Sequence, residues 1–301
     1  MATFSVYSDV PDFLANGAAN VETASLVGGS APLSTSVAAG ATTLPLTGVI
    51  GFPPSGTFTA YLLDGANSER VLASVSGGSL VVGAGTAAAH AAGITVCSAG
   101  SAGCLADAII RASRAIEGYC KQGPDGGVDR SLFASLRTEI AHGPSTRAHF
   151  DTNYALVISP WRWPVLSLST VMVQFGADGP INLATTPIFI PTEGRWIIVP
   201  YASVAPSPVL YSIQGRRGDG FVATWSYVGG PCVGSALAGV PDDMRMACHL
   251  LVADILSQRQ NPYGVSEASQ GKVHRIHRHR SDTWTSLFRE HAYELLAPYA
   301  H

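Results

Sequence analysis

The sequence predicts an α+β fold, in which helices and strands occur in separate blocks along the chain. Two amphipathic helical patterns, at 103–122 and 242–260, flank a long stretch of short β-branched and aromatic runs. The absence of alternating strands and helices disfavours a doubly wound parallel sheet. The 32 Gly and 19 Pro residues indicate many turns and short strands.

The chain carries little charge for its size. Hydrophobic residues make up 47% of the 301 residues, which is enough for a packed core, whereas charged residues make up only 13%, about half of the roughly 25% typical of soluble domains. Either much of the surface is buried in subunit interfaces, or β-rich domains are covered by Ser, Thr and Gly. The net charge of −3 provides no global attraction to nucleic acid.

The cysteines and the apolar segments bear on the compartment. Five Cys occur, in odd number and without a CxxC pair or zinc-finger spacing, so we expect reduced, mostly buried thiols in a protein assembled in the cytosol. The first residues lack the basic and apolar regions of a secretory signal. No apolar stretch reaches the roughly 20 residues that a membrane span needs.

Two segments precede the first long helix. Residues 1–37 are polar and rich in Ala and Ser, and we expect an extended N-terminal arm, with disorder as the alternative. Residues 38–98 alternate short apolar runs with Gly, Pro and Asn-Ser turns, the pattern of a small antiparallel β-domain. Its turn GFPPSG is rigid because each Pro fixes φ and removes an amide donor.

Residues 99–301 are predicted to form a core of long amphipathic helices with a β-meander. Helices are expected at about 103–122, 131–141, 242–260 and 281–298, with Ser131 capping the second and Asp242 favouring the dipole of the third. The short runs at 150–229, bounded by Pro or Gly, predict a meander that packs on these helices. The helical side chains expected in the core or an interface are Leu105, Ile109, Ile116, Tyr119, Leu251, Ile255, Trp284 and Phe288.

The β-domain contains three marks of a known module. They are the GFPPSG turn, Glu69 within a strand and the closing TAAAHAAG of Thr86 to Gly93. Together they resemble a small β-module that recurs in phage tail, baseplate and fibre proteins. The resemblance implies an attachment surface rather than an active site.

Four segments after residue 100, taken in their order along the chain, carry a second resemblance. LADAIIRASRAIEGYCKQ contains Ala112, Ile116, Glu117, Tyr119 and Cys120 in an A-x-x-x-I-[ED]-x-Y-C ending, and it is followed by WPVLSLSTVMV, VPDDMRMACHLLVADIL and SDTWTSLFREHAYELLAPYA. In this order they resemble the head–tail connector (adaptor) proteins of long-tailed bacteriophages, over roughly residues 100–301. The residues before the first helix depart from that family, whose members usually begin close to it.

The adaptor resemblance implies a non-enzymatic, structural virion protein located at the neck. It implies a homo-oligomeric ring, a dodecamer in that family, which sits under the portal protein, extends the channel for genomic DNA and offers a docking surface to a tail terminator or stopper protein. A ring of this kind needs two different patches on each subunit. The capsid is a candidate partner of the β-module. The alternative function is a tail-fibre or baseplate attachment protein that uses residues 38–98.

The strongest local feature is the basic stretch KVHRIHRHR. Three readings stay open, namely contact with the portal or a neighbouring subunit, contact with DNA phosphates, and a solvated loop. Tight phosphate binding would act as a brake on moving DNA, which disfavours the second reading. The residues concerned are Lys272, His274, Arg275, His277, Arg278, His279 and Arg280.

No catalytic or cofactor site is predicted. The chain contains no GxSxG, HExxH, GxxxxGK[ST] or GxGxxG motif. The histidines at 274–279 lack a Cys or carboxylate at supporting spacing, and the flanking Arg residues repel a cation. His90 and His249 are interpreted as structural residues. We therefore expect no enzyme activity, no metal and no cofactor.

Overall fold

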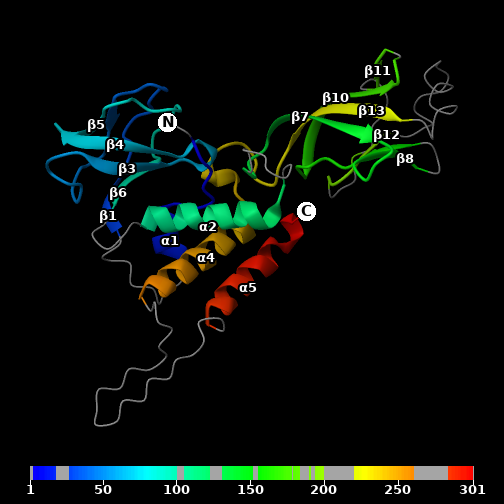
Figure 1. The fold of residues 1–301 in the computed structure, drawn as a ribbon. Helices are drawn as coiled ribbons and strands as arrows, with labels where there is room; N and C mark the ends of the chain where they lie inside the picture. The colour runs from blue at the N-terminus through cyan, green and yellow to red at the C-terminus, as the bar shows by residue number, and fades with distance from the viewer. Residues whose placement is uncertain are drawn as a thin grey trace, which may run out of the picture. The chain divides into compact units, whose positions relative to one another are not determined.

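The computed structural model describes residues 3–17, 27–99, 105–122, 131–151, 155–177, 179–183, 190, 194–199, 220–260 and 284–300. The chain divides into two compact units. One comprises Met1–Lys121 with Ser235–Ala300, and the other comprises Gln122–Gly234 (Figure 1).

Six antiparallel strands of the first unit form a closed sheet. They are β1 (Val27–Pro32), β2 (Thr43–Pro45), β3 (Phe58–Leu63), β4 (Glu69–Ser76), β5 (Ser79–Val82) and β6 (Thr95–Ala99), in the order β1-β6-β3-β4-β5-β2. The two outer strands meet, because Ser34 donates its amide to the Pro45 carbonyl at 2.9 Å and Thr47 donates to Pro32 at 3.1 Å. The sheet thus becomes a small barrel around alternating inward residues such as Leu62, Val71 and Leu80.

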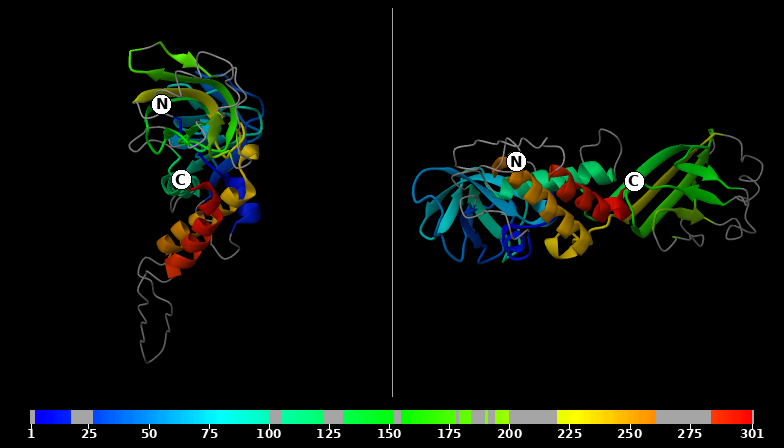
Figure 2. Two further views of the ribbon diagram at one scale, coloured as in Figure 1. Left: turned by 90° about the vertical axis from the view of Figure 1, so that its right-hand side faces the viewer. Right: turned by 90° about the horizontal axis from the view of Figure 1, so that it is seen from below.

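Four α-helices belong to the same unit as the barrel. They are α1 (Val10–Asn16), α2 (Leu105–Cys120), α4 (Asp242–Gln260) and α5 (Trp284–Leu296), with short 3-10 turns at η1 (Gly65–Asn67), η3 (Leu237–Gly239) and η4 (Ala297–Tyr299). Helix α2 packs on α4, and α4 lies antiparallel beside α5 (Figures 1 and 2). The Tyr119 ring on α2 stacks on the Tyr293 ring of α5 at 4.4 Å, and Arg289 donates to the buried Asp254 carboxylate at 2.9 Å.

The N-terminal segment, residues 3–17, is docked on both the barrel and the helices. The amides of Phe4 and Val6 donate to the carbonyls of Ser68 and Gly65 in the barrel. Tyr7, which is fully buried, donates its hydroxyl to Glu117 on α2 at 3.0 Å. A barrel residue also contacts α2 directly, because the Tyr61 hydroxyl donates to Asp107 at 3.0 Å.

The second unit is a sandwich of two antiparallel sheets. Its strands are β7 (Ser135–Gly143), β8 (Ala148–Phe150), β9 (Leu156–Ile158), β10 (Val165–Phe175), β11 (Ile181–Asn182), β12 (Ile197–Val199) and β13 (Phe221–Gly229). One sheet has the order β11-β10-β13-β7 and the other β12-β9-β8. Their shared core contains the clustered rings of Phe150, Phe175 and Phe221 together with Trp225.

The predicted fold class is wrong. Strands account for a larger share of the structure than helices, and the helices are short elements set among several sheets, so the α+β fold with a core of long helices is not formed. The predicted helices at 103–122, 242–260 and 281–298 do occur, as α2, α4 and α5. The error lies in how much of residues 99–301 is sheet, because single short strands give a weaker sequence signal than a long amphipathic helix.

The predicted helix at 131–141 is also wrong. Residues 135–143 form strand β7, which pairs with β13 over nine consecutive registered positions, from Ser135↔Gly229 to Gly143↔Phe221. The Ser131 hydroxyl accepts from the Phe133 amide in a local turn instead of capping a helix. An eleven-residue apolar pattern fits both periods, and the long-range pairing with β13 decides between them.

The boundaries before and after α2 also differ from expectation. The N-terminal residues do not form a free extended arm, since 3–17 are docked and 27–32 form strand β1 of the barrel. The barrel shares a unit with the helices, whereas residues 122–234 form a unit with its own core. Nor are these strands a simple meander, because β10 pairs with β13 and β13 with β7.

A glycine in β1 tests the barrel closure. A Cβ at Gly29 would overlap the backbone nitrogen of Phe52 and lie 2.6 Å from the carbonyl carbon of Gly51, whereas a Cβ at Gly48 would meet nothing within 4 Å. We expect Gly29→Ala to lower the free energy of unfolding by about 1–3 kcal/mol, through backbone displacement, and Gly48→Ala to leave it nearly unchanged. Urea unfolding followed by circular dichroism measures the stability of both variants. Equal stabilities of the two variants would contradict the close approach of Gly29 in β1 to Gly51 and Phe52.

Candidate functional site

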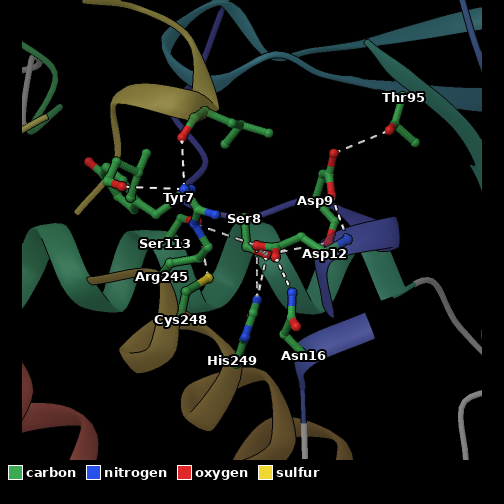
Figure 3. Close-up of polar contacts among 12 residues, drawn as sticks. Tyr7, Ser8, Asp9, Asp12, Asn16, Thr95, Ser113, Arg245, Cys248 and His249 are labelled. Carbon is green, nitrogen blue, oxygen red and sulfur yellow. Dashed lines mark hydrogen bonds and ion pairs between the residues drawn. The ribbon is translucent and has the colours of Figure 1, made fainter. Parts of the chain in front are cut away.

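A buried polar cluster joins the N-terminal segment to α2 and α4 (Figure 3). Asp9 caps α1, because its carboxylate accepts from the Asp12 amide at 2.8 Å, and Pro11 lies in the first turn. The Ser8 hydroxyl lies 2.9 Å from Nε2 of His249 and 3.0 Å from Oδ2 of Asp12. His249 Nε2 lies 3.2 Å from the same Asp12 oxygen.

A serine, a histidine and an aspartate in contact invite comparison with a hydrolytic triad. In a triad the carboxylate holds Nδ1 while the serine donates to Nε2. Here Ser8 and Asp12 both meet Nε2, and Nδ1 of His249 has no hydrogen-bond partner among the described residues. The Ser8 hydroxyl can donate to the Asp12 carboxylate, and Ser8 is only 1% exposed. The Asp12 carboxylate therefore does not hold the imidazole by Nδ1 as in a triad, and the Ser8 hydroxyl is enclosed.

The pKa values in this cluster depend on the balance between burial and nearby hydrogen bonds and charges. Burial lowers the pKa of His249 below its ordinary value, although the Asp12 carboxylate opposes the effect. Burial would raise the pKa of Asp12, but hydrogen bonds from Asn16 and Ser8 and the charges of His249 and Arg245 outweigh it, so the pKa is lowered. The contacts of Asp12 with Ser8 and His249 anchor α1 on α4.

A second buried cluster lies in the barrel. His90 Nδ1 lies 2.9 Å from Asp64 and its Nε2 lies 2.6 Å from Glu69, whose side chain is fully buried. The Glu69 carboxylate also accepts from the amides of Ala87 and Ala88. Burial alone would lower the pKa of His90, but hydrogen bonds and charges from both carboxylates outweigh it, so the pKa is raised. The imidazolium is thus clamped between two carboxylates and ties the 86–93 turn to β4.

A third cluster, in the second unit, is centred on Glu139 of β7. Its carboxylate accepts from the Arg147 guanidinium, the Tyr227 hydroxyl and the Trp161 amide. Burial, with the Glu139 charge beside it, raises the pKa of Tyr227, so the hydroxyl stays protonated and donates. The Arg147 guanidinium lies over the Trp161 ring at 4.5 Å. These contacts hold Arg147 and Trp161 on the sheet.

The described cysteines lie in the interior. Cys97, Cys120, Cys232 and Cys248 are buried, which confirms the expected burial for four of the five, while Cys104 lies outside the described residues. Burial raises the pKa of Cys120 and of Cys248 to about 12, so neither forms a thiolate at neutral pH.

Metal and membrane sites were sought among the described residues. No group of three or more His, Cys, Asp or Glu side chains there is arranged to hold a metal ion. No helix in that part of the chain is long and apolar enough to cross a membrane.

The helical residues singled out from the sequence lie largely inside the first unit. Leu105, Ile109, Ile116 and Leu251 are buried, and Tyr119, Ile255 and Phe288 are half-buried. Trp284 begins α5, but its side chain lies outside the described part. The whole basic stretch from Lys272 to Arg280 also lies outside the described residues, so its three readings stay as they were.

Sequence reasoning missed the polar cluster on the N-terminal segment. A signal was present, because Asp9, Pro11 and Asp12 stand where a helix cap, a first-turn proline and a first-turn acid belong. The partners of the N-terminal segment on α2 and α4 lie about a hundred residues or more away along the chain. Tyr7 and Glu117, for example, are separated by 110 residues. No local pattern could indicate them.

Comparisons with known proteins give one structural match. No family model and no curated protein matches this sequence. A chain from a structure described as the neck of an empty GTA particle computed with C6 symmetry matches with 15% sequence identity and a TM-score of 0.32, covering 62% of this chain and 75% of that one. A TM-score this low does not establish a shared fold.

The His90 cluster predicts a stability that falls at high pH. Its raised pKa means that the folded barrel binds a proton more tightly than the unfolded chain. The contribution is therefore complete below about pH 6.5 and is lost as pH rises through the folded pKa. His90→Gln, which leaves Glu69 buried without its cation, should cost about 3–5 kcal/mol at pH 6 and remove this alkaline loss. Thermal unfolding from pH 5.5 to 9 measures both effects; a variant with the wild-type slope would refute them.

His249 predicts the opposite pH dependence. Because its folded pKa is lowered, the unfolded chain binds the proton more tightly, so stability is complete above about pH 6.5 and decreases as pH falls below that value. His249→Gln should flatten the stability profile between about pH 5 and 6.5 while keeping the loss at lower pH that protonation of Asp12 causes. Urea titrations at several pH values, with His90→Gln as the comparison, separate the two histidines; an unchanged acid slope would contradict the assignment.

Proposed function

We propose that this chain is a structural neck protein of a tailed-phage-like particle, an adaptor that forms a ring between the portal and the tail. In this proposal the ring extends the DNA channel and offers a docking surface to a terminator or stopper protein. The subunit has no catalytic step, and its work is to hold neighbours in place.

The observation that carries the proposal is the convergence of the adaptor-like segments. The segments whose sequences resemble the first, second and terminal adaptor helices form α2, α4 and α5, in the expected order. Although α2 ends at Cys120 and α4 begins at Asp242, the two helices pack together, and the Tyr119–Tyr293 stack joins α2 to α5. Generic amphipathic helices need not converge in this way.

The chemistry of the described residues favours a structural role over catalysis. In the Ser8–His249–Asp12 contact the carboxylate meets Nε2 of His249 and not Nδ1, as a triad would require, His90 is clamped on both nitrogens, and the described thiols are buried. Each cluster links segments that are distant in sequence, which is what a rigid subunit requires.

The tail-fibre or baseplate alternative is less well supported. It needs residues 38–98 to act as an attachment module of its own. Instead, the barrel belongs to the same unit as the helices, with Tyr61 bonded to Asp107 and Thr95 bonded to Asp9. The barrel is therefore joined by hydrogen bonds to α1 and α2, and α2 carries part of the adaptor resemblance.

Mass measurement of the full-length chain, alone and mixed with the portal of the same particle, tests the proposal. We expect a closed ring of about twelve copies, coaxial with the portal in particle images viewed down the axis. His90→Gln at pH 7, if it remains folded, serves as a control with an altered interior and an unaltered surface, and should still bind. A free trimer without affinity for the portal would contradict the adaptor proposal and favour attachment through the barrel.

A further inference from the structure

Two exposed sheet faces carry almost no charge. The first, called here the sandwich face, is the side of β7, β13 and β10 that points away from the shared core of the second unit. Strand β13 alternates buried and half-buried residues, with Phe221, Ala223, Trp225 and Tyr227 inside. The residues between them, and their partners on β7 and β10, therefore face outward.

The sandwich face combines aliphatic and hydroxyl side chains. Registered pairs place Leu136 opposite Val228, Ile140 opposite Thr224, and Met172 on the other side of Thr224. Leu136 is 67% exposed and Ile140 is 60% exposed. Thr and Ser fill most of the remaining positions, and Thr138 is hydrogen-bonded to Ser226 at 2.8 Å. Among the described residues of these three strands, no Lys, Arg, Asp or Glu points to this side, because Arg137 and Glu139 alternate to the other.

Such a face is unusual for a surface that only meets water. Lys and Glu commonly protect exposed sheets and their edges from unwanted pairing, and β7 is an edge strand of its sheet. Depletion of charged residues is instead the compositional mark of an interface core. A charged partner would lose its hydration against this face without gaining a counter-charge. The sandwich face therefore selects a partner surface that is also free of charge.

The chain itself provides a surface of that kind. On the outside of the barrel, on the same side of β3 and β4 as Tyr61 and Arg70, Leu72 and Val81 are 61% and 39% exposed. Register places Thr59 beside Leu72, and Ser74 beside Val81. This group of four, called here the barrel face, is bordered by one charged residue, Arg70, because the other two charges of residues 38–98, Asp64 and Glu69, are paired with His90.

We propose that the sandwich face of one copy of this chain docks on the barrel face of the next copy. The proposal rests on the ring put forward above and supplies the contact that closes it, since a ring needs two unlike patches on each subunit. Aliphatic side chains of the two faces are buried against one another, and Thr and Ser hydroxyls satisfy one another without the cost of burying a charge.

Charge substitutions on the full-length chain test this pairing. Ile140→Lys places a cation on the sandwich face, Leu72→Asp places an anion on the barrel face, and the double variant carries both. Val233→Lys is the matched control, because Val233 is 63% exposed in the same unit as Ile140 but lies after the end of β13. All three positions are exposed, so circular dichroism and thermal unfolding should show wild-type folding for every variant.

The readout is the protein concentration at which half of the chains enter rings on purified portal, followed by sedimentation velocity and particle imaging. Ile140→Lys and Leu72→Asp should each raise this concentration at least about tenfold, since each buries an unpaired charge. The double variant should recover most of the loss, because opposite charges then meet at every interface. Val233→Lys should behave as wild type.

Other outcomes separate this interface from the proposed function. Normal rings from both single variants would overturn the interface and leave the adaptor role intact. A loss with Ile140→Lys that Leu72→Asp neither shares nor rescues would mean that two sandwich faces pair with each other, which also overturns the proposal. A wild-type chain that forms no ring on portal would contradict the adaptor function itself.

Discussion

The first unit depends on the burial of the N-terminal segment against barrel and helices at once. Val6, Tyr7, Val10 and Phe13 are each at most 3% exposed, and burial of a large apolar side chain contributes about 1.5–3 kcal/mol. The partly exposed ion pair between Arg245 and Asp12, at 3.8 Å, contributes at most about 1 kcal/mol. Apolar burial therefore holds the segment, and the polar cluster of Ser8, Asp12 and His249 fixes its register.

The same constraint explains why the polar clusters in this chain are structural. A buried polar group costs free energy unless it is paired, so His90, His249 and Glu139 each occur within a set of partners from distant segments. The pKa values of the two histidines are shifted in opposite directions by this route. His90 lies between two carboxylates that stabilise its cation, whereas His249 is desolvated beside one carboxylate that Asn16 and Ser8 already share.

These features suit a subunit that works by fitting neighbours together. Several ionisable groups, among them Glu69, His90 and Asp254, are buried in the interior, and the two faces proposed to meet in the ring carry aliphatic and hydroxyl side chains. The low charge content of the sequence left two interpretations open, an interface or an ordinary β-surface rich in Ser and Thr. The sandwich face has features of both interpretations. Leu136 and Ile140 are exposed aliphatic residues, as in an interface, and they lie among Thr and Ser at a sheet edge, as on an ordinary β-surface.

The sequence by itself determined the elements whose signals are local. The apolar stripe of Leu105, Ile109 and Ile116 specifies α2, because a 3.6-residue period over sixteen residues fits no strand. The first-turn acids Asp242 and Asp243 likewise mark α4. The sequence also marks Glu69 and the 86–93 turn as parts of the β-module, and in the structure Glu69 contacts this turn through His90 and the Ala87 amide.

Only the tertiary structure decided what depends on distant partners. Most of the run at 131–141 lies in a strand, β7, because β13, far later in the chain, pairs with residues 135–143. The barrel closes because Ser34 and Thr47 reach the strands opposite them. Residues 3–17 become part of a core because α2 and α4 provide Ser113, Glu117 and His249. Pairing and burial of this kind are non-local, and the stretch of sequence around each residue does not contain them.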